Sequence, residues 1–317
     1  MEKTIVITDY GFPDVAIERT LLEEQGWNLV AGHCTTPGEV IALGRTADAL
    51  MVQWAPVTGE VIDQLEKCQL IVRYGIGLDN LDLEAARQKG IPVCNVPDYC
   101  THEVADHAVS LALALARQLG TTDRLVRQGV WKITPPLAMP PFREMTFATL
   151  GYGRIAREVL ARAAAFGFST AFYDPFVEEA AAGRIDVRFA DKQELFRTAD
   201  IISLHLPLTG DTRHIVGPEA MAVMKPTAIV VNTARGGLVD TMALAAALDA
   251  GMLGAAGLDV LEREPPEASH PLLQCANAIL TSHTAWYSAS SVPALQRMAT
   301  EEVIRGLTGR PLHSRVG

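Results

Sequence analysis

Three side chains that can bind anions or move protons lie in loops after apolar runs of the sequence: Arg235, Glu264 and His283. Taken alone, each is more simply explained as a solvated charge or a structural histidine. Together they supply what the reduction of a keto acid needs. A guanidinium can hold the carbonyl and carboxylate, and an imidazolium can protonate the oxygen as hydride arrives. A carboxylate beside the imidazole favours its protonated form and fixes its tautomer.

A glycine-rich turn supplies a candidate phosphate cradle. Residues 151–156 read Gly-Tyr-Gly-Arg-Ile-Ala, directly after an apolar strand and before a helical run, Arg157–Phe166. Gly151 permits the tight turn, Gly153 lets the backbone approach a pyrophosphate, and Ala156 allows close packing of helix on strand. Free N–H groups at the helix start face the anion. The alternative is an ordinary glycine turn.

An acidic residue follows this turn at the spacing that ribose recognition requires. Asp174 ends the next predicted strand, and its carboxylate can accept both ribose hydroxyls and repel a 2′-phosphate. The combination of strand, turn, helix, second strand and acid predicts NAD as the cofactor, in preference to NADP. A surface aspartate without a ligand is the alternative.

The motifs need strands that end at one edge of a sheet. Short β-rich runs alternate with helical runs nearly throughout, which predicts an α/β protein with doubly wound parallel sheets covered by helices on both faces. The predicted strands are Thr4–Thr8, Asn28–Ala31, Ala49–Val52, Leu70–Tyr74 and Ile91–Cys94 in a first layer, and Thr146–Leu150, Ser169–Tyr173, Ile201–Leu204, Ala228–Asn232, Ala255–Asp259 and Ala278–Thr281 in a second.

Cap signals mark several helices between these strands. A helix is expected over Ala16–Gln25, and a second begins at Pro37 with Thr36 as its N-cap. A long helix covers about His102–Leu119, with Thr101 as cap. A short helix and a surface connection are expected within Thr121–Arg143, near a domain boundary. The final helix, about Val292–Leu307, needs a packing partner, and the first lobe is the candidate.

The composition excludes several classes of function. The chain has 317 residues, and subtracting 27 basic from 37 acidic residues gives a net charge of -10, which repels nucleic acid. The longest purely apolar stretches, such as Leu111–Ala116, fall short of the roughly 18 residues that a membrane span requires. The run Ile5–Ile7 is too brief for a secretory signal. We therefore expect a soluble, cytoplasmic protein without nucleic-acid or membrane partners.

The cysteines indicate neither disulfides nor a metal site. They are odd in number, form no C-x-x-C pair and lie mostly inside apolar runs, so reduced and partly buried thiols are expected. The five residues are Cys34, Cys68, Cys94, Cys100 and Cys275.

These motifs, in this order, resemble the D-isomer-specific 2-hydroxyacid dehydrogenase family over nearly the whole chain. The cofactor loop of the family is similar to Gly151–Ala156 with Asp174, and its catalytic arginine segment is similar to Asn232–Asp240. Its catalytic glutamate lies five residues after an aspartate, here Asp259, which selects Glu264 rather than Glu262. His283 corresponds to its acid/base. Family members usually carry glycine where this chain has Glu144, Ala148 and Ala156, which puts the register of the strand before the cradle in question.

The resemblance also implies which residues border the cofactor. They come from the cradle, the loop that begins at His205 and the segments near the nicotinamide end. The full set is Thr101, Gly151, Gly153, Arg154, Ile155, Asp174, His205, Leu206, Pro207, Thr212, Thr233, Ala234, Arg235, Asp259 and His283.

A second glycine-rich turn, within Val72–Asn80, lies in the first lobe. It exposes backbone N–H groups that suit a carboxylate, although a plain strand-to-helix turn is the alternative. In the family this turn holds the substrate carboxylate, which implies the N–H groups of Ile76 and Gly77. Arg73 is similar to an arginine that the C-terminal-binding-protein branch directs at substrate. That branch also implies that Trp286 walls the pocket, the alternative being a tryptophan buried under the last helix.

The resemblance implies a Rossmann cofactor domain, residues 100–288, inserted into a flavodoxin-like substrate domain, residues 1–99 and 289–317. The expected reaction is the NAD-dependent interconversion of a small-molecule 2-keto acid and its D-2-hydroxy acid by a homodimer. The alternatives are 3-phosphoglycerate oxidation, within a branch similar to phosphoglycerate dehydrogenase, and an NADH-gated binding protein similar to a corepressor. No regulatory domain is expected after the last helix. The sequence does not identify the substrate.

Overall fold

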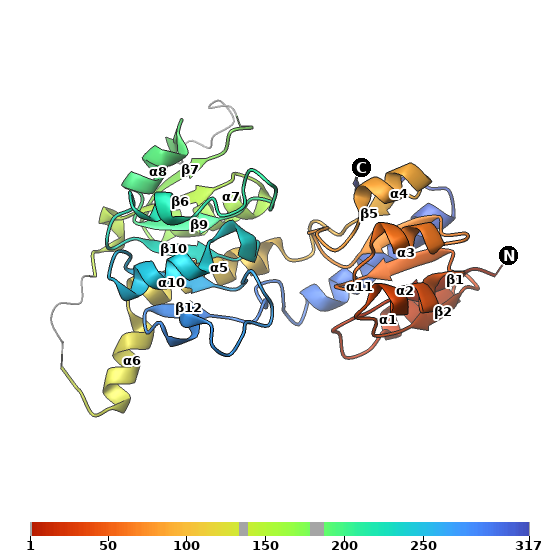
Figure 1. Cartoon of the computed structure of the whole chain (residues 1–317), viewed down its shortest axis with the longest axis horizontal. Coiled ribbons are helices and arrows are strands. Elements are labelled where there is room, and N and C mark those ends of the chain that lie inside the picture. Colours follow the sequence, from red (N-terminus) through yellow and green to blue (C-terminus); the bar gives the residue numbers. More distant parts are fainter. Residues whose placement is uncertain (1, 133–138, 178–186, 317) are drawn as a thin grey trace. The chain divides into compact units, whose positions relative to one another are not determined.

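The chain divides into two compact units. The computed structural model describes residues 2–132, 139–177 and 187–316. Unit 1 contains Met1–Cys100 and Tyr287–Gly317, and unit 2 contains Thr101–Trp286 (Figure 1). Each unit has its own sheet, so the predicted α/β class with two sheets is confirmed.

Unit 1 is built around a six-stranded sheet. Its strands are β1 (Thr4–Ile7), β2 (Asn28–Ala31), β3 (Ala49–Val52), β4 (Leu70–Arg73), β5 (Val93–Cys94) and β13 (Arg315–Val316). They lie in the order β13-β5-β4-β3-β1-β2. Among the described residues β1 to β5 run parallel, whereas β13 is antiparallel to β5. The short antiparallel edge strand β13 was not predicted.

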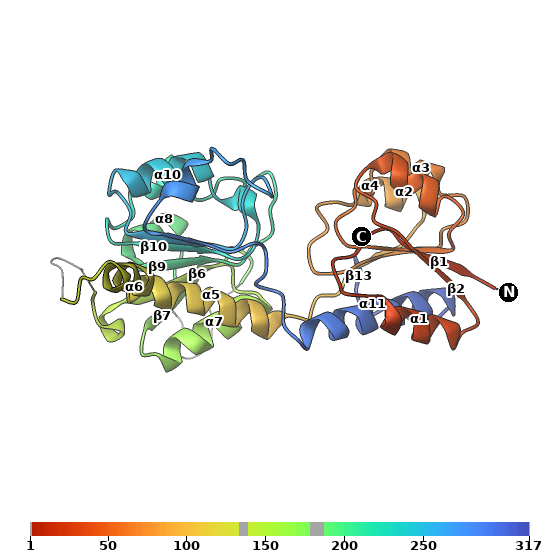
Figure 2. The ribbon, with the colours of Figure 1, turned by 90° about the horizontal axis from the view of Figure 1, so that it is seen from below.

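Helices cover both faces of this sheet. Figure 2 shows α2 (Pro37–Gly44), α3 (Gly59–Gln64) and α4 (Leu83–Lys89) on one face, and α1 (Ala16–Glu23) and α11 (Ser291–Leu307) on the other. Thr36 caps α2 as predicted, because its side chain accepts the Glu39 N–H while Glu39 binds the Thr36 N–H. The final helix, α11, packs against α1, β3 and β4.

A buried polar network joins three of these elements. The carboxylate of Glu18, on α1, is fully buried and accepts the Tyr74 hydroxyl at 2.8 Å and the Gln296 amide of α11 at 2.9 Å. Burial raises the pKa of Glu18, although these hydrogen bonds oppose the shift. Tyr74 follows β4 directly, so the network fixes the start of the turn predicted to bind a carboxylate.

Unit 2 is built around a seven-stranded parallel sheet. Its strands are β6 (Thr146–Leu150), β7 (Ser169–Tyr173), β8 (Val187–Arg188), β9 (Ile201–Leu204), β10 (Ile229–Asn232), β11 (Ala255–Leu258) and β12 (Ala278–Leu280). The order β12-β11-β10-β9-β6-β7-β8 reverses direction at β6, which is the switch point of a doubly wound sheet. Strand β6 pairs in regular register with both neighbours, so Glu144 and Ala148 leave the strand intact.

Two apolar clusters cover the faces of this sheet. One contains residues of α5 (Thr101–Ala116) and α7 (Arg154–Ala165), and Figure 2 shows both helices below the sheet. The other contains residues of α8 (Lys192–Thr198), α9 (Pro218–Met221) and α10 (Thr241–Asp249). Short 3₁₀ turns lie at Phe142–Glu144, Gly236–Leu238 and Pro271–Gln274.

Several helix ends differ from the predictions, among them the end of α1 at Glu23 and the start of α11 at Ser291. Thr101 begins α5 rather than flanking it. The helix predicted to reach Leu119 ends at Ala116, because Gln118 has a left-handed φ of 50° and separates it from α6 (Leu119–Arg127). Helix α7 begins at Arg154 rather than Arg157. Part of the predicted surface connection, residues 133–138, lies outside the described residues.

The thiol and membrane predictions can be compared with the structure directly. All five cysteines are free thiols, four of them buried, with Cys275 partly exposed. Within the described residues no helix has the length and apolar character needed to cross a bilayer, and no cluster of side chains suited to a metal ion is found there.

Candidate active site

The glycine turn lies at the switch point of the unit 2 sheet. Gly151 has a φ of 95°, and its N–H donates to the Tyr173 carbonyl at 2.8 Å. A Cβ at Gly151 would lie 2.2 Å from the carbonyl oxygen of His205, which follows the neighbouring strand β9. Only glycine fits, because both the left-handed backbone and the contact exclude a side chain.

The first turn of α7 is suited to an anion. Gly153 is the N-cap residue and supplies no side-chain hydrogen bond, and Arg154 and Ile155 begin the helix. A Cβ at Gly153 would meet nothing within 4 Å, so the backbone faces open space that a ligand can approach. Ala156 is fully buried, as close packing of helix on strand requires.

Asp174 lies beside the glycine turn. One carboxylate oxygen accepts the Tyr152 N–H at 2.9 Å, and the other accepts the Phe176 N–H at 2.9 Å. The first contact spans 22 residues and joins the end of β7 to the turn after β6. The structure thus brings together the cradle and the acid that the sequence predicted.

The loop after β9 is held by its own side chains. The Thr212 hydroxyl accepts the Thr209 N–H at 2.7 Å and lies 2.7 Å from the Pro207 carbonyl, to which it can donate. Leu206 packs against the apolar cluster. Burial lowers the pKa of His205 to about 3, so its imidazole is neutral, and its Nε2 lies 2.8 Å from the Ser203 hydroxyl.

Arg235 lies in a turn that Asn232 shapes. The Asn232 amide nitrogen donates to the Arg235 carbonyl at 2.8 Å, and its oxygen accepts the Ala234 N–H at 3.0 Å. The Arg235 Nη1 donates to the Ala234 carbonyl at 2.6 Å. Within the described residues, the buried Thr233 hydroxyl has no hydrogen-bond partner. An unsatisfied buried hydroxyl beside the cradle edge fits a site that a polar ligand completes.

Asp259 clamps the turn that carries His283. Its buried carboxylate accepts the Thr281 hydroxyl at 2.5 Å and the Thr284 and Ala285 N–H groups at 2.9 Å. Its carbonyl accepts the His283 N–H at 2.8 Å. His283 has a left-handed φ of 54°, a conformation that is uncommon for residues other than glycine and that these contacts maintain.

Glu264 and His283 form the predicted acid–imidazole pair. His283 Nδ1 lies 2.7 Å from Glu264 Oε2, and Glu264 Oε1 accepts the Leu261 N–H at 2.9 Å. Burial opposes ionisation of Glu264, but the hydrogen bond and charge of His283 outweigh it, so the pKa of Glu264 is below its usual value. An ionised Glu264 leaves Nε2 as the His283 atom that can exchange a proton with a ligand.

The turn after β4 contains the predicted residues of unit 1. Gly75 has a φ of 133°, and a Cβ there would lie 1.4 Å from Arg73 Nη1, so the Arg73 side chain folds over this glycine. The Asn95 amide donates to the Ile76 carbonyl at 2.8 Å, just before Gly77. Trp286 is the last residue of unit 2.

Sequence reasoning missed a histidine near the clamp. His107 Nε2, on α5, lies 3.0 Å from the Thr281 hydroxyl and 3.7 Å from Asp259 Oδ1. No local pattern marked it, because the same half of α5 also carries His102, Glu103 and Asp106. Sequence reasoning also gave no role to Glu262 and His214. Their side chains lie 2.6 Å apart beside the Arg235 loop, which is residues 233–240 between β10 and α10.

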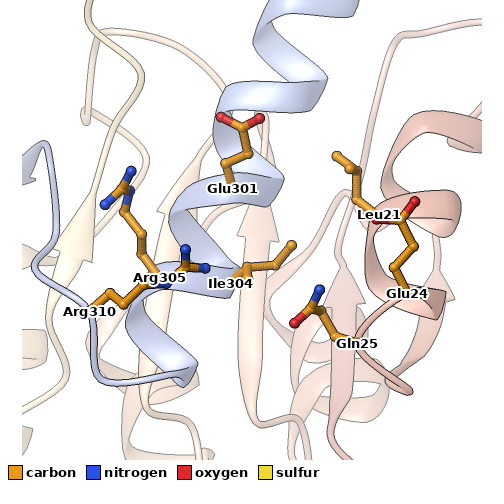
Figure 3. Close-up of a pocket in the computed structure, with 7 residues that line it drawn as sticks. All are labelled: Leu21, Glu24, Gln25, Glu301, Ile304, Arg305 and Arg310. Atoms are coloured by element: carbon orange, nitrogen blue, oxygen red, sulfur yellow. The ribbon is translucent and has the colours of Figure 1, made fainter.

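A groove in unit 1 is separate from these residues. It lies between α1 and α11, has a volume of about 390 Å³ and is lined by both charge types (Figure 3). None of the predicted site residues contributes to it, so we do not assign it to the active site. Its lining residues are Leu21, Glu24, Gln25, Glu301, Ile304, Arg305 and Arg310.

Comparisons with known proteins identify relatives over most of the chain. It is 40% identical over 307 residues to a D-3-phosphoglycerate dehydrogenase of Methanocaldococcus jannaschii, covering 96% of this chain and 57% of that protein. It is 39% identical over 268 residues to a hydroxypyruvate reductase of Thermotoga maritima, covering 84% and 85%. The chain spans about half the length of the phosphoglycerate dehydrogenases it matches.

A solved structure and a family model agree with these matches. The D-lactate dehydrogenase of Aquifex aeolicus, complexed with NAD and lactic acid, has a TM-score of 0.86 and 26% identity, with 96% of both chains covered. The model of the D-isomer specific 2-hydroxyacid dehydrogenase, NAD binding domain, matches residues 109–285, more than half of the chain. The chain therefore belongs to the D-isomer-specific 2-hydroxyacid dehydrogenase family and carries that family's NAD-binding domain.

Proposed function

We propose that this protein is an NAD-dependent oxidoreductase that interconverts a 2-keto acid and its D-2-hydroxy acid. The observation that carries the proposal is the 2.7 Å contact between His283 Nδ1 and Glu264 Oε2. It lies at the carboxyl edge of the unit 2 sheet, where the Gly151 turn and the Arg235 loop also lie. A proton donor, a cation and an anion cradle thus share one edge.

The residues that would hold the cofactor suit the phosphate and ribose groups of NAD. Its pyrophosphate would bind the first turn of α7, where a Cβ at Gly153 would meet only open space. Asp174 would accept the ribose hydroxyls, which favours NAD over NADP. The buried Thr233 hydroxyl, unpaired within the described residues, would gain a partner. When bound, NADH supplies the two electrons and the hydrogen that reduce the keto carbon.

The chain's own groups would bind the substrate and transfer the proton. The guanidinium of Arg235 would bind the substrate carbonyl, and the N–H groups of Ile76 and Gly77, together with Arg73, would bind its carboxylate. His283 Nε2 would donate its proton to the carbonyl oxygen during reduction and remove it during oxidation. Glu264 would stabilise the charged imidazole, and Trp286 would border the substrate.

A panel of 2-keto acids with NADH tests this proposal. We expect consumption of NADH with at least one keto acid, and a loss of about two to four orders of magnitude in turnover for His283→Ala while NADH binding is kept. His102→Ala is the matched control, because its imidazole is 71% exposed on α5. Full turnover by His283→Ala would remove this residue from the mechanism.

Arg235→Lys tests the binding of the carbonyl. Lysine keeps the positive charge but cannot form a planar, two-pronged contact. We expect a higher KM for the keto acid in this variant, and unchanged kinetics would argue against a guanidinium clamp.

A second candidate is D-3-phosphoglycerate dehydrogenase activity. The 40% identity to the Methanocaldococcus enzyme over 96% of this chain favours it. The 39% identity to a hydroxypyruvate reductase is nearly the same, so identity does not choose between them. Measuring the oxidation of 3-phosphoglycerate alongside the keto-acid panel distinguishes the two activities. Tight NADH binding without turnover of any substrate would instead favour a nucleotide-gated binding protein.

The domain roles and the assembly are part of the proposal. Unit 1 would be the substrate domain and unit 2 the cofactor domain of a cytoplasmic homodimer. Exposed apolar side chains on and after α6 support the dimer, namely Leu119, Val126 and Trp131. Figure 1 shows α6 extending away from the sheet of unit 2. Sedimentation equilibrium tests the assembly, and a monomer at micromolar concentration would refute it.

A further inference from the structure

Glu262 joins three loops at the carboxyl edge of the unit 2 sheet. Its Oε1 lies 2.6 Å from His214 Nε2, and its Oε2 accepts the Thr241 hydroxyl at 2.6 Å and the Thr241 N–H at 3.1 Å. We name these three residues the Glu262 junction. Burial opposes ionisation of Glu262, but the bonds from Thr241 and His214 outweigh it and hold its pKa below the usual value.

The two partners of Glu262 flank the loop that carries Arg235. Thr241 is the buried first residue of α10, which follows that loop directly. His214 lies in the preceding loop, has a left-handed φ of 50° and donates its N–H to the Gly237 carbonyl at 2.8 Å. The junction therefore holds the Arg235 loop through its C-terminal end and through its middle.

Glu262 also brings this loop against the segment that carries Glu264. A Cβ at Gly236 would lie 2.0 Å from the Leu261 carbonyl, so the two backbones touch without space for a side chain. The Leu261 N–H donates to Glu264 Oε1. A shift of the Arg235 loop thus acts on the residues next to Glu264.

We propose that Glu262 is a positioning residue: through His214 and Thr241 it fixes the Arg235 loop against the segment that carries Glu264, and so sets Arg235 relative to His283. The inference rests on the proposed function. The contacts of Glu262 are suited to this role, because hydrogen bonds to an ionised carboxylate are stronger than those between neutral groups. Three donor groups from two loops converge on one side chain, and His270 Nε2 lies 3.3 Å from the Thr241 hydroxyl.

Thr241 offers a matched pair of variants. Thr241→Val keeps the shape but removes the hydroxyl, and Thr241→Ser keeps the hydroxyl. We expect Thr241→Val to lower kcat/KM for the best keto acid about 10- to 100-fold, the loss expected for a hydrogen bond to a charged group. Its affinity for NADH should change less than kcat/KM does, because the Gly151 cradle proposed for the pyrophosphate lies outside the junction. Thr241→Ser should restore kcat/KM.

Amide exchange supplies a readout besides activity. Exchange over residues 236–241 should become faster in Thr241→Val and return toward the wild-type rate in Thr241→Ser. His214→Asn is a second variant should Thr241→Val fail to fold, because asparagine tolerates the left-handed backbone at this position. It removes the other arm of the junction and should give the same pattern.

The outcomes separate the two proposals. Equal kcat/KM in Thr241→Val and wild type, with or without faster exchange, would overturn the positioning role. A loss that Thr241→Ser does not restore would also overturn it. A wild-type enzyme that turns over no substrate would refute the proposed function, and the positioning role would fall with it. Turnover in the wild type together with an unaffected Thr241→Val would refute the positioning role alone.

Discussion

Glu264→Gln should separate the charge of the acid–imidazole pair from its shape. The pair is 2.7 Å long, and the two side chains are 37% and 38% exposed. Because solvent screens a pair that is more than a third exposed, we take the low end for a hydrogen bond to a charged group, about 1.5 kcal/mol. This corresponds to about a 10-fold loss in kcat for keto-acid reduction.

The pH profile of the same variant gives a sharper test. Under the proposed mechanism Glu264 acts as an anion, and the contact with His283 holds its pKa below the usual value, so wild type keeps this charge to a lower pH than an ordinary glutamate would. Glu264→Gln has no charge to lose, so the fall in rate that protonation of Glu264 causes in wild type at low pH should be absent from the variant. Steady-state reduction of the best keto acid with saturating NADH measures both effects.

A neighbouring acid provides the control. Glu267 lies in the same loop, is 61% exposed and pairs with Arg263 rather than with His283. Glu267→Gln removes the same charge and should leave kcat and its pH profile unchanged. If the two variants behave alike, or if Glu264→Gln keeps the wild-type profile, then the contact with His283 does not support catalysis.

Three further predictions concern Asp174, Gly151 and His205, whose carbonyl lies against Gly151. Asp174→Ala should narrow the preference for NAD over NADP, measured as the ratio of kcat/KM values, and an unchanged ratio would remove the ribose role. Gly151→Ala should destabilise unit 2 more than Gly167→Ala does, because both glycines have left-handed φ values but only Gly151 would place a Cβ 2.2 Å from another backbone atom; equal urea midpoints would contradict this. In the unfolded chain His205 takes up a proton below its ordinary pKa of 6.5, whereas in the folded chain burial lowers this pKa to about 3. The free energy of unfolding of the wild type should therefore fall by about 1.4 kcal/mol as the pH drops from about 7.5 to 5.5. Urea unfolding at the two pH values should show this fall in the wild type and about 1.4 kcal/mol less of it in His205→Gln, and an equal fall in both proteins would contradict the prediction.

The buried strands were predictable because burial on both faces leaves a continuous apolar run. The predicted bounds of β3 match those of the structure to the residue, and its four residues are all apolar and buried. The edge strand β13 escaped prediction because it is two residues long and pairs with β5, far away in the sequence. No local pattern records such a pairing.

The helix ends show where local signals compete. The motif assigned residues 154–156 to the loop, yet α7 begins at Arg154 because Gly153 already supplies the extended N-cap conformation. Gln118 gave no sign of a break, since glutamine is an ordinary helix former, but the long helix ends at Ala116 and the left-handed φ of Gln118 separates it from α6. Tertiary packing sets such breaks.

The acid–imidazole pair was predictable only because a family resemblance chose between two acids. Glu262 and Glu264 are both followed by helix-breaking or charged residues, and spacing from Asp259 alone selected Glu264. The structure shows that both acids bind an imidazole, Glu264 that of His283 and Glu262 that of His214. The second pair spans 48 residues and joins loops whose contact depends on the strand order.

Asp259 illustrates how one residue can serve both fold and site. Its Oδ1 accepts the Thr281 hydroxyl and the Thr284 N–H, with the Thr284 hydroxyl also 3.5 Å away, and its Oδ2 accepts the Ala285 N–H. A carboxylate oxygen has two acceptor positions, so Oδ1 is saturated by the turn and Oδ2 retains one position for a ligand. Any contact of Asp259 with the nicotinamide end of the cofactor would therefore use Oδ2. The same carboxylate holds the turn that carries His283, whose φ is left-handed, so under the proposed function the placement of the proton donor and the binding of the cofactor would be coupled through one buried side chain.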